Sequence, residues 1–196
     1  MNADLENLLD ELHKFGLEND HSKADRDEQM LIIAPDTGLF LSILIQATKS
    51  KSVLEVGTSN GYSTLWIADA VDRVGGKVTT VEISRKKMLM AKRNFERSGL
   101  ASVIDCRQGD ARSFLASNAS ESFDMIFLDA DRSQYACYWN EIDRVLRVNG
   151  LLVVDNATLP RPEDLSELLR LVKSSKRYLM QTLAVGKGEM VALKLR

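Results

Sequence analysis

Two acids and one arginine follow directly after an apolar segment in "FLDADRSQY", residues 127–135. The residues before Asp129 are typical of a buried strand, and Asp131 and Arg132 come immediately after its end. Carboxylates in such a place can hold a cation, take up a proton or orient a hydroxyl group. The first question is therefore which other reactive side chains the fold brings to this point.

Polar residues and glycines stand at the ends of five apolar segments. We predict strands at 52–56, 77–83, 102–108, 124–129 and 150–155. Their ends carry Glu55, Gly57 and Gly61, then Glu82, then Asp110, then Asp129 and Asp131, and last Asp155 and Asn156. Ligands bind beyond the carboxyl ends of parallel strands, so we expect these residues to surround one site.

Helical segments alternate with the predicted strands. They cover about 62–71, 84–99 with Ser84 as cap and Gly99 as end, 111–117, 133–148 and 162–174. The last segments, 177–185 and 189–196, flank Gly-Lys-Gly and predict a β-hairpin. The pattern indicates an α/β fold: a doubly wound, mostly parallel, seven-stranded sheet with a C-terminal antiparallel hairpin and helices on both faces.

The N-terminal part has a different pattern. Leucines at 5, 8, 9 and 12 predict an amphipathic helix, and the polar stretch 15–29 predicts a loop or a frayed helix. A second helix follows Pro35, with Asp36 or Thr37 as cap, and continues to about residue 47. We expect an N-terminal helical segment, 1–30, attached to a single domain, 31–196.

The composition excludes several classes of protein. The 196 residues are 44% hydrophobic and 28% charged, with a net charge of −2, so neither nucleic acid nor an anionic membrane is an expected partner. The N-terminus is acidic and amphipathic, unlike a signal peptide, and no apolar run is long enough for a bilayer span, which predicts a cytoplasmic protein. The two cysteines have no metal-binding or redox spacing, and apolar residues on the outer helices would support a homodimer.

The glycine loop "LEVGTSNGYS" does not fit a dinucleotide. A G-x-G-x-x-G fingerprint would need glycine at 57, 59 and 62, but positions 59 and 62 hold Ser and Tyr. Glu55 beside the loop would repel a phosphate and favour a cation. The alternative is a turn between strand and helix that binds nothing.

Glu82 and Asp110 are candidates for binding a nucleoside. Glu82 lies about 20 residues after the glycine loop, where a carboxylate can bind ribose hydroxyls, and Asp110 would lie near an adenine. Each also has a structural alternative, Glu82 as an acid at a helix N-terminus and Asp110 as an N-cap. One nucleoside site explains them together.

Asp129, Asp155 and Asn156 offer only oxygen ligands, which suit Mg²⁺, Ca²⁺ or Mn²⁺. Carboxylates packed together without a cation would force a proton onto one of them. The sequence has no His or Cys cluster of the kind that zinc requires, and His13 and His21 are far from these residues in sequence. The alternative for Asp155 and Asn156 is a polar turn.

Five motifs resemble those of class I methyltransferases: "VLEVGTSNGYSTLWIA", "TTVEIS", "GDA", "FDMIFLDADRSQY" and "LLVVDNATLP". More narrowly, the chain is similar to the cation-dependent O-methyltransferases of the catechol and caffeoyl-CoA type, from about residue 31 to the C-terminus. The resemblance implies a Rossmann-like methyltransferase fold, the cofactor S-adenosylmethionine (SAM) and a divalent cation, with a small hydroxylated, aromatic acceptor. It implies a cofactor site made of Glu55, Gly57, Ser59, Gly61, Ser63, Glu82, Asp110, Ala111 and Asp129, and metal ligands Asp129, Asp155 and Asn156.

Arg132 departs from that family, which usually has a lysine as general base three residues after the first metal aspartate. An arginine cannot take up the proton. Asp131 could accept it while Arg132 stabilises the anion, which makes Asp129, Asp131 and Arg132 the expected catalytic group, and another lysine could also enter the site. Alternatively, Arg132 is a surface residue paired with Asp131 or Glu141. The competing functions are a protein that binds SAM or its product SAH with weak or no transferase activity, and a methyltransferase with a non-hydroxyl acceptor.

Overall fold

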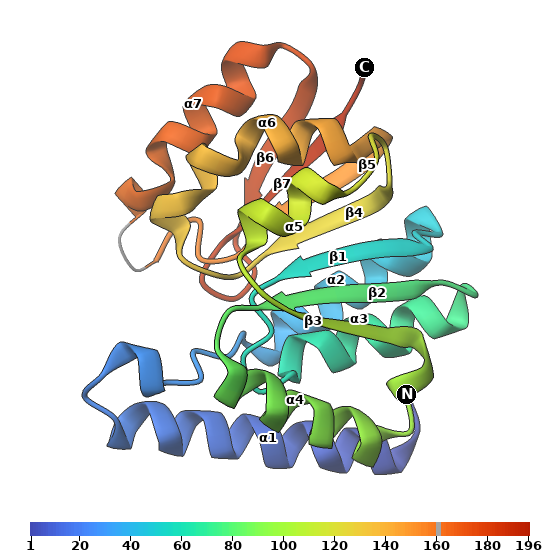
Figure 1. The fold of residues 1–196 in the computed structure, drawn as a ribbon, viewed down its shortest axis with the longest axis vertical. Helices are drawn as coiled ribbons and strands as arrows, with labels where there is room; N and C mark the ends of the chain where they lie inside the picture. Colours follow the sequence, from blue (N-terminus) through green and yellow to red (C-terminus); the bar gives the residue numbers. More distant parts are fainter. Residues whose placement is uncertain (160–161) are drawn as a thin grey trace.

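A twisted sheet forms the centre of the protein in a computed structural model, which describes residues 1–159 and 162–196 (Figure 1). Within these residues its strand order is β3-β2-β1-β4-β5-β7-β6. The strands are β1 (Ser52–Val56), β2 (Lys77–Glu82), β3 (Ile104–Gln108), β4 (Phe123–Leu128), β5 (Leu146–Val154), β6 (Tyr178–Leu183) and β7 (Glu189–Lys194). Strands β1 to β5 pair in parallel, whereas β7 pairs antiparallel with both β5 and β6. The predicted mostly parallel sheet with a C-terminal hairpin is confirmed.

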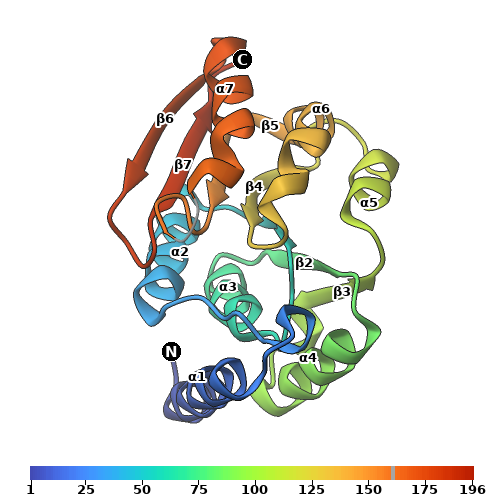
Figure 2. The same ribbon diagram turned by 90° about the vertical axis from the view of Figure 1, so that its left-hand side faces the viewer.

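Helices cover both faces of the sheet (Figure 2). On one face lie α2 (Pro35–Thr48), α3 (Tyr62–Arg73) and α4 (Arg85–Ser98), and α1 (Ala3–Ser22) packs outside them against α3 and α4. On the other face lie α5 (Ala111–Ser117), α6 (Tyr135–Val145) and α7 (Ser166–Ser175). Such two-sided cover is what the near-continuous apolar strands predict.

Alternation along each strand divides the apolar residues between two cores. In β4, Met125 and Phe127 face the core under α2 and α3, whereas Ile126 and Leu128 face the core under α5 to α7. All four are fully buried. Burial of each such side chain stabilises the fold by about 1.5–3 kcal/mol, which fixes the strand register and therefore the positions of the strand ends.

Several element ends differ from the predicted ones. Helix α1 continues to Ser22 through much of the stretch predicted as a loop or a frayed helix, and Gly16 within it packs closely on Ile32. Helix α6 ends at Val145 rather than near 148, because Leu146 already pairs with Phe123 of β4.

The predicted cap of α2 is wrong. The helix begins at Pro35 with Ala34 as N-cap and no capping side chain. Both candidate caps bond elsewhere: Asp36 accepts from Gly186 N–H at 3.0 Å, and Thr37 donates to Glu189 at 2.9 Å. By contrast, Ser84 caps α4 and Gly99 ends it, as predicted. None of the helices in the described ranges is long and apolar enough to cross a membrane.

Candidate active site

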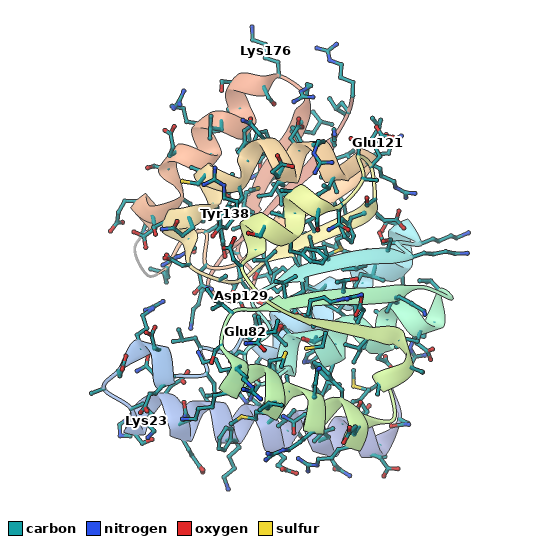
Figure 3. The ribbon with its side chains drawn as sticks, viewed as in Figure 1. Lys23, Glu82, Glu121, Asp129, Tyr138 and Lys176 are labelled. Atoms are coloured by element: carbon teal, nitrogen blue, oxygen red, sulfur yellow. The ribbon has the colours of Figure 1, made fainter. Side chains whose placement is uncertain are left out.

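The carboxyl ends of the central strands lie side by side because hydrogen bonds extend the ladders past the strand ends. The Asp129 N–H donates to the Val56 carbonyl at 2.9 Å, and the Asp155 N–H donates to the Leu128 carbonyl at 3.1 Å. Strand order reverses between β1 and β4, the place where open α/β sheets bind ligands. A cavity of about 630 Å³ opens at this edge, and Figure 3 shows Glu82 and Asp129 there.

Most of the residues expected in the site line this cavity. They are Gly57, Ser59, Ser63, Glu82, Asp110, Ala111, Asp129, Asp131, Arg132 and Asn156. Glu55, Gly61 and Asp155 do not line it. Each of these three is bonded to a lining residue or precedes one in the sequence, so the structure places them behind the wall of the cavity.

Gly57 is required by the close approach of two strand ends. Its φ is +102°, and a Cβ at this position would lie 2.2 Å from the Asp129 carbonyl oxygen. Any side chain would push the end of β4 away from the end of β1. Gly57 therefore determines how near the glycine loop between β1 and α3 lies to Asp129.

Glu55 is fully buried under the glycine loop. Its carboxylate accepts hydrogen bonds from the hydroxyls of Ser63 and Thr80, each at 2.6 Å, and from that of Thr64. Burial raises the pKa of Glu55 to about 7, and the three hydroxyl donors oppose this rise. The Glu55 carboxyl is therefore only partly ionised near neutral pH, and it lies behind Ser63 rather than in direct contact with the cavity.

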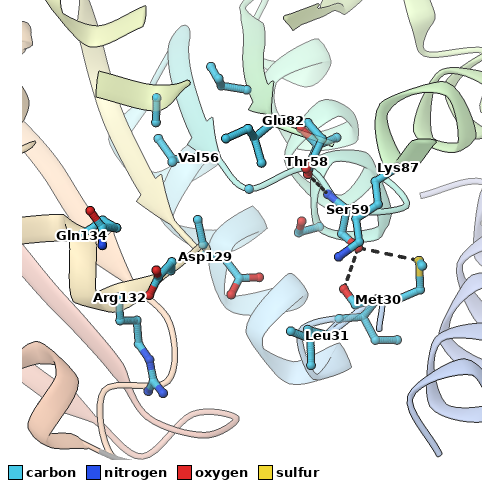
Figure 4. Close-up of a pocket in the computed structure, with 18 of the residues that line it drawn as sticks. Met30, Leu31, Val56, Thr58, Ser59, Glu82, Lys87, Asp129, Arg132 and Gln134 are labelled. Atoms are coloured by element: carbon cyan, nitrogen blue, oxygen red, sulfur yellow. Dashed lines mark hydrogen bonds between the residues drawn. The ribbon is translucent and has the colours of Figure 1, made fainter. Parts of the chain in front are cut away.

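Glu82 is held in place by two backbone donors. Its carboxylate accepts from Ser59 N–H and from Ser84 N–H, both at 2.8 Å, and is 7% exposed. It thus joins the glycine loop to the start of α4 while still lining the cavity (Figure 4). Glu82 therefore acts as an acid at a helix N-terminus, and the remaining lone pairs of its carboxylate can accept hydrogen bonds from ligand hydroxyls.

Asp110 is the N-cap of α5. Its carboxylate accepts from the Ser113 N–H at 2.9 Å and from the Ser113 hydroxyl at 3.0 Å. The backbone hydrogen bond from Ser113 is the main reason why the pKa of Asp110 is lowered. The side chain is exposed and lines the cavity next to Ala111, where its charge is available to a ligand.

Asp129 and Asp155 lie close together at the ends of β4 and β5. Burial raises the pKa of Asp129 well above its ordinary value, and the negative charges of Asp155 and Glu55 raise it further. Asp155 is 5% exposed and accepts from the Asn156 N–H at 2.7 Å and from the Asn156 side-chain amide. Asn156 itself has a φ of +59° and lines the cavity.

Glu189, which the sequence analysis did not select, adds a third carboxyl group. The pairing of Met190 with Val154 puts Glu189, one residue before Met190, beside Asp155. Burial and the Asp155 charge raise the pKa of Glu189 to about 11. Thr37 donates to its Oε1 at 2.9 Å, and a hydrogen bond with the Asp155 carboxyl contributes to the raised pKa. An acid that opens the apolar strand "EMVALKLR" was the available signal.

The chemistry of this group fits a hard divalent cation. Crowded, buried carboxyl groups are stabilised when positive charge is added between them. Asp155 and Asn156 are bonded to each other. Across residues 1–159 and 162–196, no three His, Cys, Asp or Glu side chains stand in a metal-binding arrangement. Of the three expected metal ligands, Asp129 and Asn156 lie on the cavity wall and Asp155 lies behind them.

Asp131 and Arg132 are both engaged locally. Asp131 accepts from the Ser133 N–H at 3.1 Å and from its hydroxyl at 2.8 Å, as the N-cap of the 3₁₀ turn Arg132–Gln134. Arg132 is 7% exposed; it donates to the Asn156 carbonyl at 2.6 Å and pairs with Asp164 at 3.4 Å. The pairing of Arg132 with Asp131 or Glu141 as a surface residue is therefore wrong. Its guanidinium extends away from Asp129 (Figure 4).

The segment between α1 and α2 closes one side of the cavity. The Ser59 hydroxyl donates to the Met30 carbonyl at 2.6 Å, and the Asp20 carboxylate accepts from the Met30 N–H at 2.6 Å and the Leu31 N–H at 3.0 Å. Leu31 has a φ of +51°, which is uncommon for a leucine and is sustained by these bonds. Sequence reasoning missed Met30 and Leu31 because their roles depend on contacts across the fold.

The chain is similar to known proteins over most of its length. The O-methyltransferase family profile matches residues 1–194. The catechol O-methyltransferase of Niastella koreensis is 37% identical over 139 residues, 69% of this chain and 62% of that protein. The corresponding enzyme of Mycobacterium tuberculosis is 33% identical over 126 residues, 64% of this chain and 57% of that protein. The chain thus spans about three fifths of these relatives.

A solved structure agrees with the fold over nearly the whole chain. The O-methyltransferase of Bacillus cereus in complex with SAH superposes with a TM-score of 0.82 at 26% identity, covering 96% of this chain and 90% of that one. The resemblance drawn from the motifs is confirmed. The chain belongs to the O-methyltransferase family.

Proposed function

We propose that the protein is a SAM-dependent O-methyltransferase that methylates a hydroxyl of a small, aromatic acceptor with the help of a divalent cation. The observation that carries the proposal is that two chemically different groups of residues line one cavity. Gly57, Ser59 and Glu82 line one part of it, and Asp129 and Asn156 line the other. A donor and an acceptor can therefore meet within the same enclosure.

The donor fits the first part for electrostatic reasons. SAM carries a sulfonium and an ammonium, which favour the charged form of the buried Glu55 carboxyl just behind the lining residue Ser63. Glu82 is fixed by Ser59 and Ser84 and offers acceptor lone pairs for ribose hydroxyls. These carboxylates would instead repel the negative charge of a pyrophosphate, which argues against a nicotinamide dehydrogenase.

Methyl transfer needs orientation and an anionic acceptor oxygen. The acceptor oxygen forms a bond to the methyl carbon while the C–S bond breaks. The electron pair of the C–S bond goes to sulfur, and the leaving group is the neutral thioether SAH. No acid is needed for that departure, and holding the reactants in line supplies about 7–11 kcal/mol. A bound divalent cation would lower the pKa of the acceptor hydroxyl. Asp129 and Asn156 would hold the cation, and the turn at Asn156, braced by Arg132, would orient it.

Calorimetry and a methyl-transfer assay test the proposal. SAH and SAM should bind the purified protein, and catechol should be methylated in the presence of Mg²⁺ but far more slowly in chelator. Transfer that is unaffected by chelator would remove the cation from the proposal. Binding of SAH without transfer to any catechol, phenol or alcohol would favour the binding-protein alternative, and transfer to amines alone would indicate a different acceptor.

A further inference from the structure

The loop between β6 and β7 is fastened to the turn that follows β5. The Lys187 carbonyl accepts hydrogen bonds from the N–H groups of Thr158 at 3.2 Å and Leu159 at 3.1 Å, and from the Thr158 hydroxyl at 2.6 Å. The Ala157 N–H donates to the Gly188 carbonyl at 2.8 Å. Four bonds thus hold the backbone of Lys187 next to the Asn156 turn.

Gly188 makes this close contact possible. Its φ is +95°, and a Cβ there would lie 2.3 Å from the Thr158 hydroxyl oxygen. With a side chain at 188 the loop would have to move away from the turn. The backbone is therefore shaped so that residue 187 reaches the cavity from a fixed position.

The Lys187 side chain lines the same cavity as Asp129 and Asn156. This end of the cavity, lined by Asp129, Asn156 and Lys187, is called the acid end. Lys187 forms no ion pair with any residue in 1–159 or 162–196. Its ammonium is exposed and can turn toward a ligand.

An acceptor oxygen that becomes an anion here meets a predominantly negative wall. The charged residues lining this end are Asp129, Asp131, Arg132, Asp164 and Lys187. Asp131 is oriented by Ser133, and Arg132 is bonded to Asn156 and Asp164 with its guanidinium directed away from Asp129. Lys187 is the lysine that the loop geometry supplies at this end.

We propose that Lys187 is a catalytic residue whose ammonium contacts the acceptor oxygen and stabilises it as an anion. The inference rests on the proposed methyl transfer. In the step, the acceptor O–H bond breaks and its proton passes to solvent water, while Lys187 keeps its three protons. The oxygen then forms its bond to the methyl carbon, and the C–S electron pair goes to sulfur.

The test compares three variants in the full chain: Lys187→Met, Lys187→Arg and, as a matched control for loss of an exposed lysine on α7, Lys173→Met. With SAM, Mg²⁺ and catechol, Lys187→Met should lower kcat about 10²-fold, the effect typical of removing one group that stabilises an oxyanion. Lys187→Arg should stay within about fivefold of the parent protein, because it keeps the charge. SAH affinity should be the same in all variants.

A titration of bound 4-nitrocatechol gives a second readout that does not need turnover. Its absorption reports ionisation, so the parent protein and Lys187→Arg should lower its apparent pKa, and Lys187→Met should lower it less. Unchanged kcat and ionisation in Lys187→Met would overturn the proposal. Equal loss in Lys187→Arg and Lys187→Met would also overturn it, because the lysine would then be needed as a proton acceptor. Failure of the parent protein to bind SAH would instead refute the proposed function.

Discussion

The carboxylates at the two ends of the cavity differ in their hydrogen-bond partners. The methyl-donor end is the part lined by Gly57, Ser59 and Glu82. There, Glu55 accepts hydrogen bonds from three hydroxyls, Glu82 from two backbone N–H groups, and Asp110 from the N–H and the hydroxyl of Ser113. At the acid end, burial and the negative charge of Asp155 raise the pKa values of Asp129 and Glu189.

This difference in hydrogen bonding indicates which kind of ligand each end favours. Carboxylates that already have their donors are preorganised and need only small rearrangements when an organic cation with hydroxyl groups binds. Carboxyl groups that face one another are incomplete until a proton or a metal cation lies between them. The methyl-donor end can therefore bind its ligand with little rearrangement, whereas the acid end is stabilised most by an added positive charge.

The largest expected effect comes from removing the acid end. Asp129→Ala combined with Asp155→Ala should lower Mg²⁺-dependent methyl transfer by at least about 10³-fold, because acceptor orientation and the cation are lost together. SAH binding should remain, which calorimetry would show. Asp72→Ala, at an exposed acid of α3, is the control. Rates that stay the same with and without chelator in the double variant and the parent protein would contradict the assignment.

Glu55 tests the methyl-donor end through stability. A pKa raised from 4.5 to about 7 means that the folded protein binds more protons than the unfolded chain between these values. The unfolding free energy should therefore fall as pH rises through this window, by about 3 kcal/mol from Glu55 alone. Glu55→Gln should remove that part of the fall when urea unfolding is compared at pH 5 and pH 8. Glu96→Gln, on the exposed side of α4, should leave it unchanged.

Glu82 should show a smaller effect, on affinity. Glu82→Ala removes the acceptor of the Ser59 and Ser84 N–H groups and a carboxylate that lines the cavity. A lost charge-assisted hydrogen bond costs about 1.5–3 kcal/mol, so SAH should bind roughly 10- to 100-fold more weakly in calorimetry. An unchanged dissociation constant would mean that Glu82 serves only the helix terminus and the loop.

Most of the fold followed from local patterns. Apolar segments and helix signals such as Ser84 and Gly99 gave the order of elements, because strands covered on both faces must be apolar throughout. Errors arose where tertiary contacts override local preference, as where Leu146 pairs with Phe123 and shortens α6. Thr37 bonds to Glu189, 152 residues away, instead of capping α2.

The candidate site could be predicted only where residues stand at strand ends. Glu82, Asp110 and Asp129 were found in this way, and they line the cavity. Glu189 and Lys187 were missed because the antiparallel return of β7 brings them beside β5, and the sequence does not give the pairing of the hairpin with β5.

Arg132→Lys gives the smallest expected effect and separates support from chemistry at the acid end. Arg132 donates to the Asn156 carbonyl and pairs with Asp164, and a lysine has no planar fork with which to reach both. One lost bond should lower stability by about 1 kcal/mol in thermal unfolding. Turnover should stay within about threefold, because the guanidinium extends away from Asp129 and the charge facing the acceptor is that of Lys187. A hundredfold fall in kcat at unchanged stability would give Arg132 a direct role and would weaken the assignment of Lys187.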